Sequence, residues 1–223
     1  MLPVIAIDGP AASGKSSTGA RVARRLGWVH LDSGALYRGL TRVALDLGTL
    51  ADARAILAAA TRRGLGLARR GEEVVTVLDG RETEALIRTP EVTAAVSEVS
   101  ALPALREWAT ERFRDAARGG TALVLDGRDI GTAVFPDAPL KVYLTATAEA
   151  RARRRLRQAG RPEDPDAVSR EAAALAARDR ADSARPVAPL VRAPDAIEVD
   201  TTGLTLAEQV DRIVALAHRA GLS

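Results

Sequence analysis

A glycine-rich segment near the N-terminus has the composition of a loop that binds phosphate. Residues 9–16 fit the pattern Gly-x-x-x-x-Gly-Lys-Ser/Thr, the P-loop. The apolar run at 4–7 predicts a buried strand before it, and helical spacing from Gly14 to about Leu26 predicts a helix after it. Backbone N–H groups in such a loop point into one concavity, and the helix N-terminus adds positive potential. A glycine-rich turn with an incidental lysine would leave the apolar strand unexplained.

The side chains of this loop indicate a site for a nucleoside triphosphate. Gly9 and Gly14 carry no Cβ, so the backbone can approach phosphate oxygens closely. Lys15 can reach the β- and γ-phosphates, and the Ser16 hydroxyl can ligate Mg²⁺. We therefore expect a nucleoside triphosphate to be bound by Gly9, Pro10, Ala11, Ala12, Ser13, Gly14, Lys15, Ser16 and Ser17.

The composition is that of one folded domain. The chain has 223 residues, and 47% of them are apolar, which is enough for a sizeable core. The first strand begins almost at Met1 and leaves no room for a signal peptide, and no apolar run approaches the roughly 18 residues of a membrane span. There is no cysteine for a disulfide or a thiolate metal site. We expect a cytoplasmic monomer, and the 3% aromatic content disfavours nucleic-acid binding.

Nearly all the basic residues are arginines, since Lys15 and Lys141 are the only lysines. The planar guanidinium group matches phosphate oxygens and stays charged, so this bias suits a protein that handles phosphates. A GC-rich coding bias or selection for heat resistance would produce the same composition. Individual arginines must therefore be argued from their positions.

Apolar runs alternate with helical patterns along the chain. We expect strands at 28–31, 122–126, 139–144 and 196–200, and helices over 34–47, 51–62, 89–118, 149–158, 166–181 and 205–220. Because the strands are short and apolar on both faces, they predict an α/β fold with a parallel sheet between helices. The glycines and alternating apolar residues of 64–82 predict a small antiparallel β insertion.

Polar residues follow the predicted strands, at what must be one edge of a parallel sheet, where ligands of such sheets bind. The strand ends carry Asp8, Asp32, Asp126 and Asp200. Arg38 and Arg128 come soon after two of these ends and could clamp a second phosphate opposite the triphosphate. Each arginine alone is more simply a surface charge, but beside a P-loop the clamp is the better interpretation.

A third group of charges is spaced for one helix face. Arg178, Asp182 and Arg185 lie four and three residues apart. An exposed, salt-bridged helix surface is the usual alternative for such a pattern. The same alternative applies to the arginines of 151–157, although one sign of charge crowds that segment unless an anion lies nearby.

Together these motifs resemble those of the bacterial cytidylate kinases, P-loop kinases of nucleoside monophosphates. The resemblance covers nearly the whole chain and is carried by residues 9–17, 31–38, 87–89, 126–136, 178–185 and 188–190. It implies a single domain with a monophosphate-binding insertion at about 63–118 and a helical lid at about 148–178. It also implies that the γ-phosphoryl group of ATP is transferred to CMP or dCMP with Mg²⁺, yielding CDP or dCDP.

The resemblance also implies roles for individual residues. Arg38 and Arg128 would hold the CMP phosphate, while Arg178, Asp182 and Arg185 would engage the sugar and neighbouring groups as the site closes. The residues implied at the cytosine end are Ser33, Ser97, Arg106 and Asp129. The lid residues are Arg151, Arg154 and Arg155, and those nearest the chemistry are Lys15, Arg128, Arg178 and Asp182. The lid looks short around residues 159–161.

Phosphoryl transfer of this kind requires alignment and charge neutralisation rather than a general base, because the acceptor phosphate is already ionised. The two histidines, His30 and His218, receive no role. Three alternatives remain: a kinase of another acceptor such as AMP, UMP or shikimate, a GTPase switch, and a non-catalytic nucleotide-binding module. A GTPase would usually carry an Asn-Lys-x-Asp motif, and this chain contains no asparagine. A non-catalytic module would not need clustered acceptor arginines.

Overall fold

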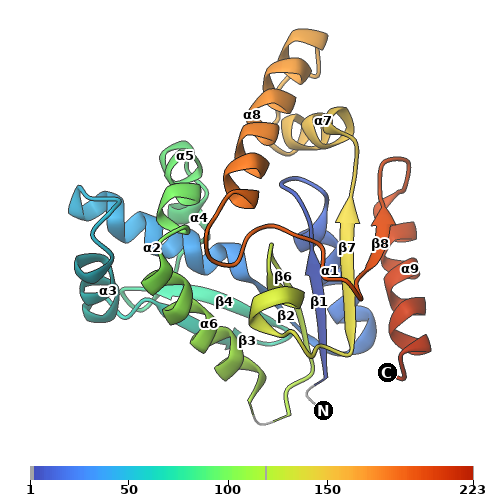
Figure 1. Ribbon diagram of the computed structural model, residues 1–223, viewed down its shortest axis with the longest axis horizontal. Helices are drawn as coiled ribbons and strands as arrows, with labels where there is room; N and C mark the ends of the chain where they lie inside the picture. The colour runs from blue at the N-terminus through green and yellow to red at the C-terminus, as the bar shows by residue number, and fades with distance from the viewer. Residues whose placement is uncertain (1–2, 119, 223) are drawn as a thin grey trace.

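A twisted β-sheet with helices on both faces forms the body of the molecule (Figure 1). The structure is a computed structural model that describes residues 3–118 and 120–222. The strand order is β3-β4-β2-β6-β1-β7-β8, with β5 paired to β4. The strands are β1 (Val4–Asp8), β2 (Val29–Asp32), β3 (Gly66–Arg70), β4 (Glu73–Leu78), β5 (Arg81–Glu82), β6 (Leu123–Asp126), β7 (Leu140–Thr145) and β8 (Ile197–Asp200). The parallel α/β sheet predicted from the sequence is confirmed.

The P-loop strand β1 lies in the middle of the sheet. It pairs in parallel with β6 on one side and with β7 on the other, so that Ile7 is opposite both Asp126 and Val142. The chain leaves β1 for β2, returns to β6, and then crosses to β7, which makes the edge beside β1 a topological switch point. Ligands of open parallel sheets bind at the carboxyl ends of strands beside such a point. The order of the strands therefore predicts where the site lies.

Two hydrophobic cores hold the helices on the sheet. The helices are α1 (Lys15–Leu26), α2 (Ser33–Leu47), α3 (Ala53–Arg62), α4 (Glu84–Ile87), α5 (Pro90–Val99), α6 (Pro103–Ala117), α7 (Ala148–Gln158), α8 (Pro165–Ser183) and α9 (Leu206–Arg219), with a short π-helical turn η1 (Ile130–Val134). One core packs α2, α3, α5 and α6 on one face of the sheet. The other packs α1 and α9 on the opposite face. Alternate residues of β1 enter opposite cores, which fixes the register of that strand.

The predicted β insertion is present, and it extends the main sheet. β3 and β4 pair antiparallel from Gly66–Val77 to Arg70–Glu73, as the sequence predicts. β4 also pairs in parallel with β2, through His30–Glu73 and Leu31–Val74. The hairpin is therefore continuous with the strands that carry the P-loop.

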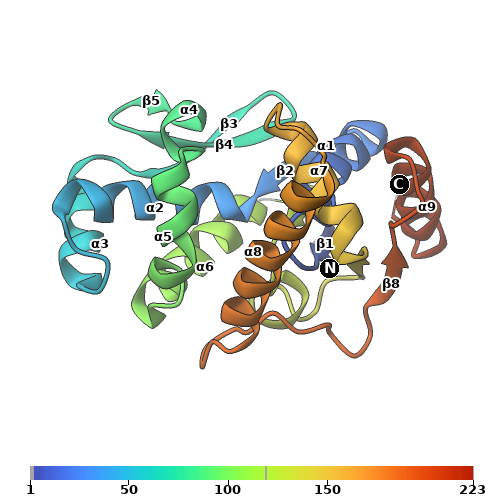
Figure 2. The ribbon, with the colours of Figure 1, turned by 90° about the horizontal axis from the view of Figure 1, so that it is seen from above.

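The helix α8 packs through a small apolar cluster and not through either of the two main cores. Figures 1 and 2 show α8 between α5 and β1, with α7 beside it above the carboxyl ends of β1 and β7. A third apolar cluster joins the two helices to the P-loop through Ala11, Ala152, Leu156, Val168 and Leu175. The predicted lid segment is thus docked on the phosphate-binding loop in this structure.

Sequence patterns predicted most elements but missed two short ones. The predicted strands and helices agree with the structure to within a few residues, and the segment predicted as helical over 89–118 contains α5 and α6, the second of which begins at Pro103. α4 and η1 were not predicted. α4 has four residues, which is too short for a helical period to show, and the segment of η1 contains β-branched residues and glycine, which are typical of strands and turns. Among the described residues, the helices are all too short or too polar to cross a bilayer.

We expect the core under the site to depend on Phe113. Its side chain is fully buried, and its ring meets that of Tyr37 edge to face with the centroids 6.0 Å apart. Phe113→Ala should lower the free energy of unfolding by about 3–5 kcal/mol, because it removes apolar contacts and leaves a cavity. Denaturant unfolding measures this, with Leu47→Ala, an exposed position of α2, as the near-neutral control. A loss below about 1 kcal/mol for Phe113→Ala would contradict this description of the core.

Candidate active site

The P-loop joins β1 to α1 in a backbone conformation that glycine permits. Gly9 has φ +147°, and a Cβ there would lie 2.2 Å from the carbonyl oxygen of Leu144 on the neighbouring strand. Gly14 has φ +97° and caps α1, which begins at Lys15. At Gly9 a side chain would collide with β7, and at both glycines the positive φ is a backbone conformation that glycine adopts without strain. The predicted order of strand, loop and helix is therefore confirmed. Helix N-termini after such loops commonly bind anions, and the binding of phosphate by residues 9–17 stays a prediction.

Lys15 lies folded within this loop. Its side chain is 6% exposed, and Nζ donates to the carbonyl oxygen of Pro10 at 2.7 Å and to Ser13 Oγ at 3.4 Å. Burial lowers the pKa of Lys15 well below its ordinary value, and the nearby charge of Arg128 lowers it further. The charged form of this buried lysine would be stabilised if a phosphate group replaced the two uncharged partners, because hydrogen bonds between charged groups are stronger.

A hydroxyl and a carboxylate meet at the start of α1. Ser16 Oγ donates to Asp126 Oδ2 at 2.6 Å, and Asp126 stands at the carboxyl end of β6 beside β1. The other carboxylate oxygen of Asp126 lies 2.9 Å from Nε2 of His30. Mg²⁺ prefers oxygen ligands and is usually held by one or two protein groups together with substrate phosphates. The Ser16–Asp126 pair fits that donor set, and in residues 3–118 and 120–222 no larger group of His, Asp and Glu gathers at one point.

Arginines with little exposure lie near one another beside the site. Arg38 is 5% exposed and donates to the carbonyl oxygen of Ile87 and to Thr93 Oγ1. Burial lowers the pKa of Arg38 to about 9, and the charges of Arg178, Arg88 and Arg155 add to that effect. The pKa of Arg178 falls to about 10 through burial and the charge of Arg128. These groups stay charged at neutral pH, so several like charges are held together with too few anions.

Asp182 of α8 is the acid shared by part of this cluster. It accepts hydrogen bonds from Arg128 Nε at 3.0 Å, from Arg185 Nη2, and from Ser97 Oγ at 3.3 Å. Burial raises the pKa of Asp182, but Arg128, Arg185 and Arg178 outweigh burial and hold that pKa below its ordinary value. One carboxylate thus joins residues from α5, the segment after α8 and the loop after β6. The single helix face predicted for Arg178, Asp182 and Arg185 holds only for the first two, because α8 ends at Ser183 and Arg185 contacts Asp182 from beyond the end of the helix.

A second buried ion pair lies beside Tyr37. Arg106 Nη2 donates to Asp129 Oδ2 at 2.5 Å, Nη1 donates to the carbonyl oxygen of Ser100, and the guanidinium lies 5.1 Å from the centre of the Tyr37 ring. Burial lowers the pKa of Arg106, but the charges of Asp129, Tyr37 and Asp182 and the hydrogen bond to Asp129 together outweigh burial and leave that pKa above its ordinary value. Within the described residues, the buried polar atoms that lack a hydrogen-bond partner include Tyr37 Oη, Arg106 Nε, Arg178 Nε and Arg185 Nε. A site lined by unsatisfied donors is prepared for a polar ligand.

The loop that carries Arg128 and Asp129 is anchored to β1. Asp8 accepts hydrogen bonds from the backbone N–H groups of Ile130 and Gly131, at 2.9 and 2.8 Å. Gly131 leaves room for the Lys141 side chain, since a Cβ there would lie 3.0 Å from Cδ of Lys141. The acid at the end of β1 therefore fixes the loop that presents Arg128 to the P-loop.

Comparisons with known proteins agree with this geometry. The model of the cytidylate kinase family matches residues 5–219. The cytidylate kinase of Geobacillus kaustophilus is 43% identical over 218 residues, which cover 96% of each chain. That of Pseudomonas aeruginosa is 44% identical over 226 residues, 99% of this chain and 97% of the relative. The chain belongs to the cytidylate kinase family.

Membership of this family makes the protein a phosphotransferase of the nucleoside monophosphate kinase class. A shikimate kinase from Acinetobacter baumannii has the same span, covering 100% of this chain and 97% of its own, with 19% identity and a TM-score of 0.47. That similarity is too low to carry an argument. The assignment depends on the family match and on the sequence relatives.

The arginines of α7 are placed differently from one another. Arg151 donates to the carbonyl oxygen of Ala11 and pairs with Asp179, which also accepts from the N–H of Ala11 at 2.8 Å. Arg154 donates to the side chain and carbonyl oxygen of Thr201. Within the described residues, Arg155 is the one of the three whose side chain makes neither an ion pair nor a hydrogen bond, and it lies near enough to lower the pKa of Arg38. The lid role of all three stays a prediction, and the geometry favours Arg155.

The alternative of a salt-bridged surface describes two other arginines of this helix. Arg153 pairs with Glu149 at 3.0 Å, and Arg157 pairs with Glu163 at 2.9 Å. Both arginines are largely exposed, so these pairs contribute little to stability. Glu149 and Glu163 therefore offset part of the positive charge on this helix, and no phosphate is needed for those two arginines.

Three residues that proved important were missed or left without a role. Asp126 was noted only as a strand-end acid, His30 was given no role, and Asp179 was quoted only as part of a motif. The signal for Asp126 was available, because an acid at the carboxyl end of the strand beside the P-loop strand is where a metal-linked carboxylate is expected. Ser33, predicted at the cytosine end, donates to the carbonyl oxygen of Asp126 at 2.7 Å, and its role stays a prediction.

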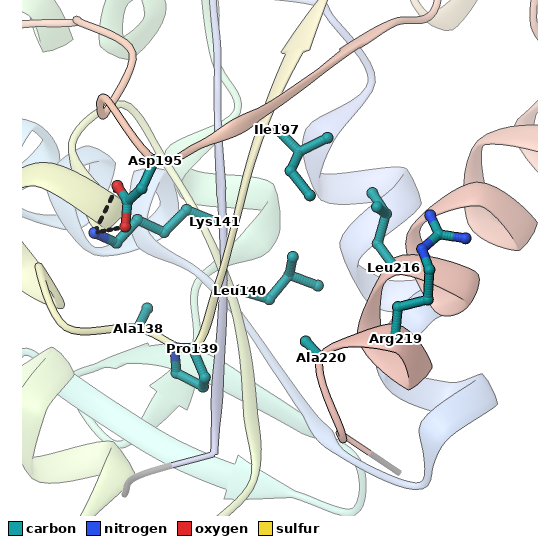
Figure 3. Close-up of a pocket in the computed structure, with 9 residues that line it drawn as sticks. All are labelled: Ala138, Pro139, Leu140, Lys141, Asp195, Ile197, Leu216, Arg219 and Ala220. Atoms are coloured by element: carbon teal, nitrogen blue, oxygen red, sulfur yellow. Dashed lines mark hydrogen bonds and ion pairs between the residues drawn. The ribbon is translucent and has the colours of Figure 1, made fainter.

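The cavity drawn in Figure 3 lies away from this site. It is lined by residues from the start of β7, the segment before β8 and the end of α9, among them Lys141, Ile197 and Leu216. It lies at the amino end of β7, whereas the P-loop follows the carboxyl end of the parallel neighbour β1. Lys141 in its wall is already paired with Asp195 at 2.8 Å. The cavity therefore takes no part in the account of phosphoryl transfer.

The buried Asp8 predicts a pH-dependent change in stability. Burial raises its pKa from 3.8 to about 6, although its two backbone hydrogen bonds act in the opposite direction. Between about pH 4 and 6 the unfolded chain loses this proton and the folded protein keeps it, so stability falls as the pH rises. The wild type should lose about 3 kcal/mol over this range relative to Asp8→Asn, which cannot titrate.

Denaturant unfolding of the wild type and Asp8→Asn at pH 4, 5, 6 and 7 measures this difference. Other acids, such as Asp182, titrate in both proteins and cancel in the comparison. A difference that stays constant with pH would mean that Asp8 is not protonated in the folded protein at pH 5.

Proposed function

We propose that the protein transfers the γ-phosphoryl group of ATP to CMP and dCMP, yielding CDP and dCDP. The observation that carries this proposal is the set of mutually repelling arginines, Arg38, Arg128, Arg155 and Arg178, of which Arg128 also acts on Lys15 of the P-loop. The P-loop accounts for one phosphate chain, and the second group of cations needs a second anion. A nucleoside monophosphate supplies that anion, and the family match favours cytidylate.

The donor side is formed by the loop and the start of α1. Backbone N–H groups of the loop and the charge of Lys15 would hold the β- and γ-phosphates. Ser16 and Asp126 would hold Mg²⁺ together with those phosphates. When bound, the ion neutralises charge on the phosphate oxygens that accompany the transferred group. Magnesium is proposed here on the fit of the Ser16 and Asp126 oxygens to that ion.

The acceptor side would be aligned by Arg38, Arg128 and Arg178. The phosphate of CMP is already ionised near neutral pH, so no base has to remove a proton from it. These arginines instead hold the acceptor oxygen in line with the γ-phosphorus and offset the repulsion between two anionic substrates. Binding of the acceptor also relieves the repulsion among the arginines, which the lowered pKa values of Arg38 and Arg178 express.

The cytosine end would be recognised beside the Arg106–Asp129 pair. Both side chains of this pair are almost fully buried. Ser97, the other residue assigned to the cytosine end, donates a hydrogen bond to Asp182. Cytosine presents an amino group where uracil presents a carbonyl oxygen. A carboxylate such as Asp129 accepts a hydrogen bond from the former and repels the latter. Leaving such buried groups unpaired costs about 1–3 kcal/mol each, which disfavours UMP.

The helices α7 and α8 would act as the lid. Arg155 lies near Arg38 and Arg178 and would bring further positive charge to the transferred group. Exclusion of water by such a lid limits hydrolysis of ATP when no acceptor is bound. The division into a core, a monophosphate-binding insertion at about 63–118 and a lid at about 148–178 is part of this proposal. A monomeric, cytoplasmic protein stays a prediction.

The acceptor assay tests the proposed function. ADP release should be measured with ATP, Mg²⁺ and each of CMP, dCMP, UMP, AMP and shikimate in turn. We expect turnover with CMP and dCMP and at least a tenfold lower kcat/KM with UMP, since one unpaired buried group already costs about 1.4 kcal/mol. Lys15→Met is the control, and its folded protein should show turnover reduced by orders of magnitude. Equal rates with CMP and AMP would contradict the proposal.

Arg38 offers a test of the acceptor phosphate site. Arg38→Met removes a charge-assisted contact worth about 1.5–3 kcal/mol, so KM for CMP should rise roughly 10- to 100-fold while KM for ATP stays nearly constant. Without ligand, Arg38→Met should not lower the free energy of unfolding in the way that removal of a salt-bridged arginine does, because neighbouring cations repel Arg38. The matched control is Arg42→Met, one turn further along α2, where the arginine pairs with Asp46 at the surface. An unchanged KM for CMP in Arg38→Met would contradict the assignment.

A further inference from the structure

The imidazole of His30 lies against the carboxylate that we place beside the metal. His30 is in β2 and Asp126 ends the neighbouring strand β6. The distance from His30 Nε2 to Asp126 Oδ1 is 2.9 Å, and the two residues are 8% and 2% exposed. An ionised carboxylate has no proton to give, so Nε2 is the donor in this bond. This holds for the neutral ring with its proton on Nε2 and for the charged ring alike.

The two oxygens of Asp126 therefore have separate partners. Oδ1 accepts from His30, and Oδ2 accepts from Ser16 Oγ at 2.6 Å. The contact with His30 fixes the rotation of the carboxylate about its own bond. Its free lone pairs and the Ser16 hydroxyl then remain at the start of α1, where the phosphates bind. Without His30, the carboxylate could turn away from Ser16.

The space for the imidazole is provided by a glycine of α1. A Cβ at Gly19 would lie 3.1 Å from Nε2 and 3.2 Å from Cδ2 of His30. Gly19 is inside α1, and glycine there costs roughly 1 kcal/mol relative to alanine, so its presence needs a reason. The close approach of the ring to the helix backbone supplies one. The glycine, the histidine and the acid form one arrangement directed at Ser16.

We propose that His30 is a positioning residue that holds Asp126 in the orientation needed for the divalent cation of the ATP complex. The inference rests on the proposed function for the presence of that cation. The competing explanation is that His30 merely fills the core and satisfies a buried acid. The two explanations differ in one measurable property: positioning changes the affinity for the metal, whereas filling the core changes only stability.

The test measures Mn²⁺, as a spectroscopic substitute for Mg²⁺, bound to the full-length protein with a non-hydrolysable ATP analogue. Electron paramagnetic resonance gives the dissociation constant without any turnover. We expect His30→Leu to weaken Mn²⁺ binding about 10- to 100-fold, the usual effect of losing a partner of a metal-linked carboxylate. His30→Gln, whose amide nitrogen can take the place of Nε2, should remain within about threefold of the wild type. His218→Leu, at an exposed histidine of α9, is the matched control.

Gly19→Ala gives an independent variant that keeps the imidazole and pushes it from its place. It should weaken Mn²⁺ binding in the same direction as His30→Leu, and it decides the question if His30→Leu does not fold. Wild-type Mn²⁺ affinity in His30→Leu, or in Gly19→Ala in that case, would overturn the inference and leave a structural histidine. If the wild type itself binds no Mn²⁺ with the analogue, the inference and the proposed donor site both fail. If Mn²⁺ binding falls as expected but CMP is not a substrate, only the acceptor part of the proposed function fails.

Discussion

Positive charge that the protein does not neutralise is the constraint on which the site depends. Lys15 and Arg38 are buried and Arg178 is half-buried. Burial lowers the pKa of each, and the charge of Arg128 lowers those of Lys15 and Arg178 further, as the charge of Arg178 does for Arg38. The acids near these cations, among them Asp179 and Asp182, do not restore the lowered pKa values, and Asp182 is shared among several arginines. A protein tolerates such an arrangement when an anion completes it. In the proposed reaction, two substrates would bring phosphates to one place and would satisfy both groups of cations.

The fold maintains this repulsion by fixing each cation to a different element. The P-loop is held between β1 and α1, Arg38 is carried by α2, and Arg178 is carried by α8. Asp8 anchors the loop of Arg128, and Asp179 joins α8 to the backbone of Ala11. Because β1 and β6 are neighbouring parallel strands, Asp8 and Asp126 at their carboxyl ends lie at the same edge of the sheet. The order of the strands therefore brings these charged side chains to one edge of the sheet.

The sequence was sufficient to predict the sheet, the helices and the P-loop, because apolar periodicity and glycine placement are local properties. It was less informative about which arginine of a cluster is free. Arg151 and Arg155 look alike in the sequence, yet one is paired with Asp179 and the other is not paired within the described residues. His30 could not be recognised, since its partner lies 96 residues away and depends on strand register. Short elements such as α4 leave no periodic signal, and that segment delivers the carbonyl oxygen of Ile87 to Arg38.

The most direct test of the two opposed cation groups is a crystal structure of the protein with a non-hydrolysable ATP analogue and CMP bound together. The account predicts that the γ-phosphate lies in the loop of residues 9–16 and that the CMP phosphate lies against Arg38 and Arg178. An acceptor oxygen should then be about 3–3.5 Å from the γ-phosphorus and in line with the leaving oxygen. A CMP phosphate bound elsewhere, with Arg38 and Arg178 still facing each other and no anion between them, would contradict the account.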